Sequence, residues 1–195
     1  MSKVPRAAWI MLAVIVVLGG GSLIAVQTGA AQSVLSMLDD DGPDYPTLDT
    51  SRLTAAQQRI VEVTHTEFDA QPPGTKYSDG VDESWCADFV SWVMHSSDVV
   101  YTNPNSGGWR IPGVATLTEY FQSRGDFRSA DSGYRPKLGD VVLYAADSKF
   151  GQHTNIVLRD DDGVLTTVGG NEAGRIRIGS FAPATDAGLV GYGVL

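Results

Sequence analysis

The order of two hydrophobic patterns limits what this chain can fold into. Between residues 53 and 125, apolar residues recur at helical spacing, whereas from residue 140 onward they form short apolar or alternating runs. The dipeptide Asp162-Gly163 separates two of these runs and predicts a β-hairpin. Helices followed by antiparallel strands predict an α+β architecture, in which N-terminal helices pack on an antiparallel sheet.

The expected elements can be placed by their end signals. One helix begins after Thr54, a good N-cap, and ends before Pro72. A second covers residues 84–94, with Ser84 or Asp82 as its cap, and a third is ended by Gly125. Strands are expected over residues 140–144, 153–159, 164–168, 175–178 and 189–194.

The N-terminus predicts export. Residues 7–26 carry no charge and follow Lys3 and Arg6, and a membrane-spanning helix needs roughly 20 apolar residues. Positive charge ahead of such a run keeps the N-terminus in the cytoplasm. Residues 1–31 therefore fit a transmembrane signal anchor, or a signal peptide cleaved among the small residues near position 30. The exported part is expected to be single-pass membrane-bound or secreted.

Residues 32–51 are polar and acidic and predict a flexible linker. A single domain follows over residues 52–195, which is long enough to bury a core. The net charge of −9 makes nucleic acid an unfavourable partner, because an acidic surface repels phosphates. No residue spacing indicates a metal site or cofactor, and the acidic run 160–163 fits a hairpin tip better than a calcium loop.

The chain has one cysteine, Cys86. It cannot form an internal disulfide, so its thiol is buried, paired between chains, or reactive. Its expected place is the first turn of the second helix, where unpaired N–H groups and the helix dipole favour a thiolate. An imidazole partner would complete the activation.

Only one of the three histidines fits that role. His65 lies among polar residues of the first helix. His95 follows Cys86 by nine residues, about 13 Å along a continuous helix. His153 begins a strand, and a base at a strand start can face a helix start. Just past the hairpin, Asn171 or Glu172 could fix the orientation of the imidazole, and the sequence leaves both open.

Four segments resemble the CHAP family of cysteine- and histidine-dependent amidohydrolases and peptidases. They are residues 85–93 around the cysteine, the Pro-x-x-Gly-Asp segment in 136–142, the histidine strand from 153, and Gly170-Asn171. They occur in family order and the resemblance covers residues 77–195. It implies a papain-like α+β fold and hydrolysis of amide bonds in peptidoglycan.

The resemblance also implies roles for single residues. Cys86 would attack the carbonyl, His153 would accept and return the proton, and Asn171 would orient His153. Tyr77 resembles the tyrosine that lines related NlpC-type sites, and Trp85 and Trp109 are further candidates for substrate contact. No cofactor is implied.

Two departures from the family pattern concern the site. Many relatives carry glycine after the histidine region and glutamate two places before the asparagine, where this chain has Asn155 and Gly169. Without a carboxylate at position 169, Asn171 is the expected main orienter and Glu172 a substitute. The alternative function is a catalytically silent module that binds wall peptide or an envelope protein partner. The sequence does not say whether the sugar–peptide amide, the stem peptide or a cross-bridge is cut.

Overall fold

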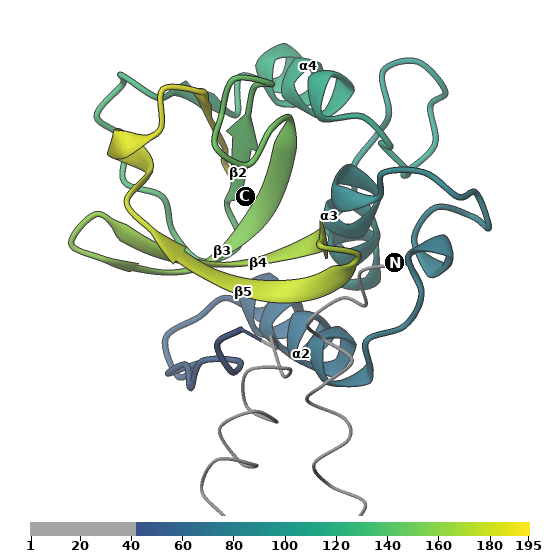
Figure 1. Ribbon diagram of the computed structural model, residues 1–195, viewed down its shortest axis with the longest axis horizontal. Coiled ribbons are helices and arrows are strands. Elements are labelled where there is room, and N and C mark those ends of the chain that lie inside the picture. Colours follow the sequence, from purple (N-terminus) through teal and green to yellow (C-terminus); the bar gives the residue numbers. More distant parts are fainter. Residues whose placement is uncertain (1–41) are drawn as a thin grey trace, which may run out of the picture. The chain divides into compact units, whose positions relative to one another are not determined.

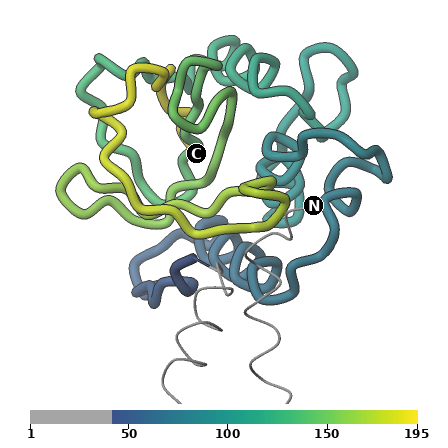
Figure 2. The backbone as a smooth tube through the Cα atoms, viewed as in Figure 1, coloured from purple at the N-terminus to yellow at the C-terminus, as the bar shows by residue number. Residues whose placement is uncertain are grey.

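The computed structural model describes residues 42–195, so the predicted anchor or signal peptide and the first part of the predicted linker lie outside the described residues. Three α-helices come first: α2 (Ala55–Ala70), α3 (Cys86–Ser96) and α4 (Val114–Arg124). Six strands follow: β1 (Phe127–Ser129), β2 (Val141–Tyr144), β3 (His153–Asp161), β4 (Val164–Glu172), β5 (Arg175–Phe181) and β6 (Leu189–Gly193). Short 3-10 helices cover Gly74–Lys76 and Pro183–Thr185. This order of elements confirms the predicted α+β class, and Figure 2 traces the chain from its coiled first half into its extended second half.

The helix ends follow their sequence signals. Thr54 and Gln57 form a capping box at the start of α2, and Gln71 ends that helix in the left-handed conformation. Gly125 ends α4 with a φ of 77°, which glycine adopts without a steric penalty. No helix within residues 42–195 has the length and apolar character needed to cross a bilayer.

The strands form one antiparallel sheet in the order β1-β6-β2-β3-β4-β5. The predicted hairpin joins β3 to β4, and Asp162 and Gly163 both have positive φ, as a tight primed turn requires. Tyr144 pairs with His153 at the end of the β2–β3 ladder, and this pairing fixes the position at which β3 begins.

The helices cover one side of this sheet (Figure 1). Helix α3 packs on β3 and β4, α2 lies against α3 and β5, and α4 contacts β1 and β2. The main apolar core lies between these helices and the sheet and includes Phe89, Val93, Leu117 and Ile156. A smaller cluster around Val142, Val157 and Tyr192 covers the other face. Helix α3, which begins with Cys86, thus packs across two adjacent strands of the sheet.

The Gly139-Asp140 segment has a structural role. The Asp140 carboxylate accepts from the backbone N–H groups of Lys137 and Leu195 and from the Tyr134 hydroxyl. Gly139 has a φ of 93°, and a Cβ there would collide with Leu195. Together these contacts fix the entry into β2 and place the β2–β3 pair.

The predicted linker is too long at its C-terminal end. Tyr45 and Leu48 pack against the main core. The Tyr45 hydroxyl lies 2.7 Å from the Thr64 hydroxyl, and its ring stacks on His65 at 4.3 Å. Burial of an aromatic ring on α2 therefore orders this segment, and the folded domain begins before residue 52.

Candidate active site

Cys86 is the first residue of α3. The sequence predicted Ser84 or Asp82 as the helix cap, and this is wrong: Trp85 is the N-cap and no side chain caps the helix. The first-turn N–H groups therefore receive no side-chain oxygen and remain directed toward the thiol end of the helix. The Cys86 side chain is 6% exposed.

His153 is the first residue of β3 and is 7% exposed. Its imidazole forms a side-chain hydrogen bond with Cys86. The structure thus brings together the helix-start cysteine and the strand-start histidine, as their places in the sequence predicted. His65 pairs with Asp69 and stacks on Tyr45, and His95 stacks on Trp109 at the other end of α3, so neither reaches the thiol.

The second partner of the imidazole is Glu172. Its Oε1 lies 3.1 Å from His153 Nε2, and its side chain is 22% exposed. Because Nε2 faces the carboxylate, the Nδ1 atom is left for the thiol. The sequence left Asn171 and Glu172 open as the residue that orients the imidazole. In the structure it is Glu172 that contacts the ring nitrogen. Asn171 lies beside the ring, as one of the residues around a small cavity.

A β-bulge carries Glu172 to the imidazole. The β4–β5 register shifts between Gly169 and Glu172, and Asn171 has a φ of 60°. A side chain at Gly169 would collide with the Glu172 carboxylate. The carboxylate therefore occupies the space that a side chain at position 169 would enter, so the glycine that replaces the family's glutamate makes room for an acid from three residues further on.

Gly170 serves the packing of the same segment. A Cβ at this position would collide with the rings of Phe89 and Trp85. Because Gly170 has no Cβ, β4 can lie directly against α3, and the bulge comes close to the start of the helix. The glycine pair thus sets the distance between the element that carries Cys86 and the one that carries Glu172.

The electrostatics of the site favour a charged imidazole. Burial alone would lower the pKa of His153, but hydrogen bonds to Cys86 and Glu172 and their negative charges outweigh it and raise that pKa to about 9. These contacts therefore stabilise the protonated form of His153. Such a ring can give a proton to a departing group.

The predicted substrate contacts have different surroundings from those expected. Tyr77 is fully buried, its hydroxyl donates to Glu67, and its ring stacks on Trp85 at 5.3 Å. Both rings belong to the core, so the expectation that Tyr77 faces substrate is wrong. Trp85 is 7% exposed, and its ring packs edge-on against Phe89 of α3. Trp109 stacks on His95 at 4.7 Å, at the opposite end of α3 from Cys86.

The structure adds a residue that the sequence did not single out. Phe150 is 40% exposed and borders a cavity of about 270 Å³ together with His153, Asn171, Glu172 and Ala173. Cys86 is not one of its lining residues and is joined to it by the hydrogen bond to His153. An exposed aromatic ring beside a buried imidazole offers an apolar wall to a substrate. The sequence signal that could have identified Phe150 is its position as an aromatic residue within the turn at residues 148–151.

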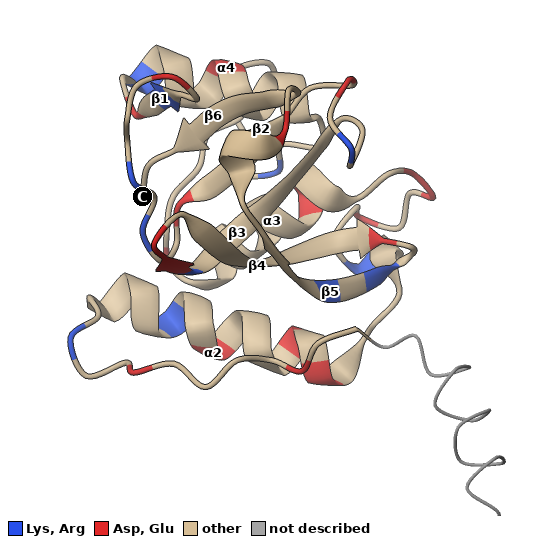
Figure 3. Cartoon of the chain, turned by 60° about the vertical axis from the view of Figure 1, so that its left-hand side comes forward, with Lys and Arg blue, Asp and Glu red and all other residues tan. Residues whose placement is uncertain are grey.

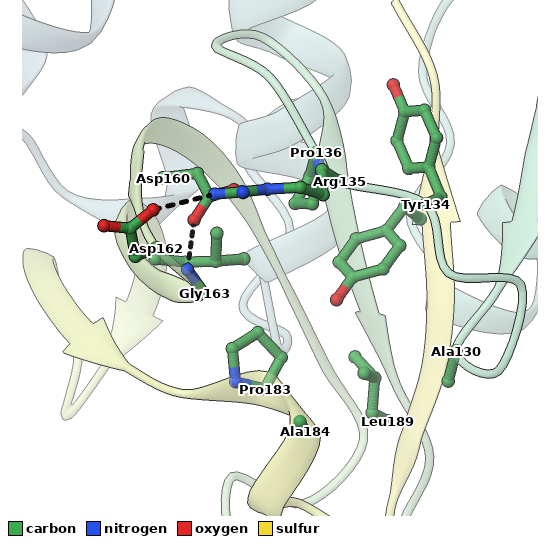
Figure 4. Close-up of a pocket in the computed structure, with 12 residues that line it drawn as sticks. Ala130, Tyr134, Arg135, Pro136, Asp160, Asp162, Gly163, Pro183, Ala184 and Leu189 are labelled. Atoms are coloured by element: carbon green, nitrogen blue, oxygen red, sulfur yellow. Dashed lines mark hydrogen bonds and ion pairs between the residues drawn. The ribbon is translucent and has the colours of Figure 1, made fainter.

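A larger cavity of about 360 Å³ lies elsewhere (Figure 4). Tyr134, Pro136, Pro183 and Leu189 border it, and Arg135 pairs there with Asp160 and Asp162. It contains neither Cys86 nor His153. Size therefore does not identify the reactive site, whereas the contacts among the cysteine, histidine and glutamate do.

The comparisons with known proteins agree with the geometry. A family model described as CHAP domain matches residues 76–171, a segment that includes Cys86 and His153 and ends one residue before Glu172. Searches of curated proteins and of solved structures gave no significant match. Residues 76–171 of the chain therefore form a CHAP domain.

Proposed function

We propose that this protein is a cysteine amidohydrolase or peptidase that cuts amide bonds of bacterial cell-wall peptide, with Cys86 as nucleophile. The CHAP domain suggests peptidoglycan-related amidase or peptidase chemistry. The observation that carries the proposal is the chain of contacts from Cys86 to His153 to Glu172 at the start of α3. We assign the orienting role to Glu172 in place of Asn171.

The first half of the reaction forms a thioester. The Cys86 thiolate attacks the carbonyl carbon, and the backbone N–H groups at the start of α3 stabilise the oxyanion. The C–N bond then breaks as His153 gives its proton to the departing amine. Glu172 holds the ring by its Nε2 side and stabilises its positive charge until that transfer.

The second half releases the acid. His153, now neutral, accepts a proton from water, and the hydroxide attacks the thioester carbon. The C–S bond breaks, the thiolate of Cys86 re-forms, and the carboxylic acid product leaves. Phe150 supplies an apolar wall beside the reacting bond. Export to the cell envelope through residues 1–31 would bring the domain to this substrate and stays a prediction.

The proposed function can be tested with purified peptidoglycan. The protein is expected to release new amino groups, and prior treatment with iodoacetamide is expected to stop that release, because alkylation removes the nucleophile. Mass spectrometry of the fragments then identifies the bond that was cut. Saturable binding to wall fragments without release would instead support the silent binding module.

The raised pKa of His153 predicts the alkaline side of the pH profile. The leaving amine needs protonated His153, so kcat/KM is expected to stay high up to pH 8 and to fall as the pH rises through about 9. In Glu172→Gln, which lacks one source of the raised pKa, the fall should occur at lower pH. An alkaline limb that stays in place in this variant contradicts the assigned contact.

The same group links folding stability to pH. Its folded-state pKa of about 9 lies above the ordinary value of 6.5. Protonated His153 therefore stabilises the fold fully below about pH 6.5, and this contribution is lost as the pH rises through 9.

A further inference from the structure

The loop that precedes α4 lies along one face of α3. Three consecutive loop residues contact positions 88, 91 and 95 of that helix, which are spaced to share a face. Trp109 stacks on His95, Arg110 pairs with Asp88, and the Ile111 backbone N–H donates to the Ser91 hydroxyl. The loop is therefore fixed to the helix that carries Cys86.

Arg110 bridges the turn at which α3 begins. Its Nε lies 2.8 Å from Asp88 Oδ1, and its Nη2 donates to Glu83 Oε1. Glu83 lies three residues before Cys86 and Asp88 two residues after it. The guanidinium thus joins the segment that enters the helix to the first turn of the helix, and its side chain is 23% exposed. We refer to these three side chains as the Arg110 bridge.

Asp88 is an unusual residue to bury at this place. Its side chain is 0% exposed. Within residues 42–195, neither of its oxygens accepts a well-aligned hydrogen bond, and its contact to Arg110 is an ion pair. Burial, only partly offset by the Arg110 charge and supported by repulsion from Glu83 and Asp79, raises the pKa of Asp88 to about 6. A buried ion pair of this kind adds little to stability compared with apolar packing. Its presence here therefore points to a role in positioning the first turn of α3.

The missing side-chain cap of α3 explains why the Arg110 bridge could matter at this turn. Trp85 offers no capping oxygen, which leaves the first-turn N–H groups for the reaction but leaves the turn without its usual fixation. An arginine that contacts both sides of this turn fixes it from behind without occupying those N–H groups.

We propose that Arg110 and Asp88 are positioning residues, which hold the first turn of α3 so that the Cys86 sulfur meets the His153 imidazole. The inference rests on the proposed function, because it concerns the same site. It predicts that the bridge acts on the rate of the chemical step and on thiol reactivity, and much less on substrate binding.

The test is the Arg110→Ala variant with chemical rescue. A misplaced nucleophile can cost about 10²-fold in rate, so kcat is expected to fall by about that factor while KM changes little. Because Arg110 is partly exposed, millimolar methylguanidinium should enter the vacated space and restore part of the lost kcat. The matched control is Arg135→Ala, which also removes an arginine paired with two carboxylates, but at the larger cavity. It should keep wild-type kcat and show no response to methylguanidinium.

A second variant separates positioning from folding. In Asp88→Asn the side chain keeps its size but not its charge, and the raised pKa of Asp88 indicates that the fold accepts a neutral group there. This variant should unfold at a temperature close to that of the wild type and still lose kcat. If Arg110→Ala and Asp88→Asn both keep wild-type kcat, or if methylguanidinium restores nothing to a folded Arg110→Ala, the bridge has no positioning role.

Thiol alkylation distinguishes this failure from failure of the proposed function. The rate at which iodoacetamide modifies Cys86 at neutral pH is measured for the same variants, and it needs no wall substrate. Slower alkylation in Arg110→Ala, restored by methylguanidinium, supports the bridge even if the wild type releases no amines. Alkylation and amine release that both match the wild type overturn the bridge while leaving the proposed function intact.

Discussion

Replacing His153 by alanine is expected to reduce amine release from peptidoglycan to the level of the Cys86→Ala variant. Nucleophile and base act as one unit, so each single substitution and the double substitution should lower kcat/KM by a similar factor, about 10⁴-fold or more. The physical reason is the contact between the two side chains, without which the thiol lacks its proton partner and the amine lacks its acid. The measurement is kcat/KM for all three variants on one peptidoglycan preparation.

The matched control for this result is His65→Ala. His65 stacks on Tyr45 and pairs with Asp69 on α2, away from the thiol. Its removal should leave kcat/KM unchanged. If the double variant loses much more activity than either single variant, Cys86 and His153 act independently and the assigned mechanism is wrong.

Replacing Glu172 by glutamine is expected to lower kcat by about 10⁴-fold, the size of the loss when the orienting acid of a catalytic triad becomes an amide. The amide keeps the size of the carboxylate but carries no charge, and its NH₂ group can turn the histidine to the wrong tautomer. The 3.1 Å contact to His153 Nε2 is the reason for this expectation. The loss should fall on kcat rather than on KM, because Glu172 acts through the histidine.

Asn171→Gly provides the comparison for Glu172→Gln. Glycine accepts the φ of 60° at this position, so the substitution removes the side chain without straining the bulge. Activity should fall far less than in Glu172→Gln. The opposite order, with the larger loss at Asn171, would return the orienting role to the residue that the family pattern first indicated.

The fold was predictable where periodic patterns and end signals coincide. Helix α2 has both a capping box and a proline just after its end, and the Asp162-Gly163 turn determines a hairpin from local chemistry. Strand β1 was not predicted, because three residues are too few to show an alternation and its pairing with β6 decides it. Tyr45 was assigned to a linker because its burial depends on α2, which the local sequence does not reveal.

The site was predictable to the extent that its residues begin elements. Cys86 starts a helix and His153 starts a strand, so motif order alone placed them together. Glu172 reaches the imidazole through a register shift, which residue types do not encode. Asp88 and Arg110 are 22 positions apart, and only the packed loop brings them together.

The distribution of charge over the fold could not be predicted from the net charge. Acidic side chains are spread over α2 and the loops, whereas β5 carries Arg175 and Arg177 (Figure 3).

The Glu172 carboxylate in the space above Gly169 has a consequence for how related sequences are compared. The resemblance to the CHAP pattern implies an acid at position 169, where this chain has glycine, so a comparison by position alone would miss the acid at the imidazole. The acid is nevertheless at the ring, supplied from three residues further along the chain through a β-bulge. In this chain, the position of a carboxylate in space therefore identifies the partner of His153, whereas the residue type at position 169 does not.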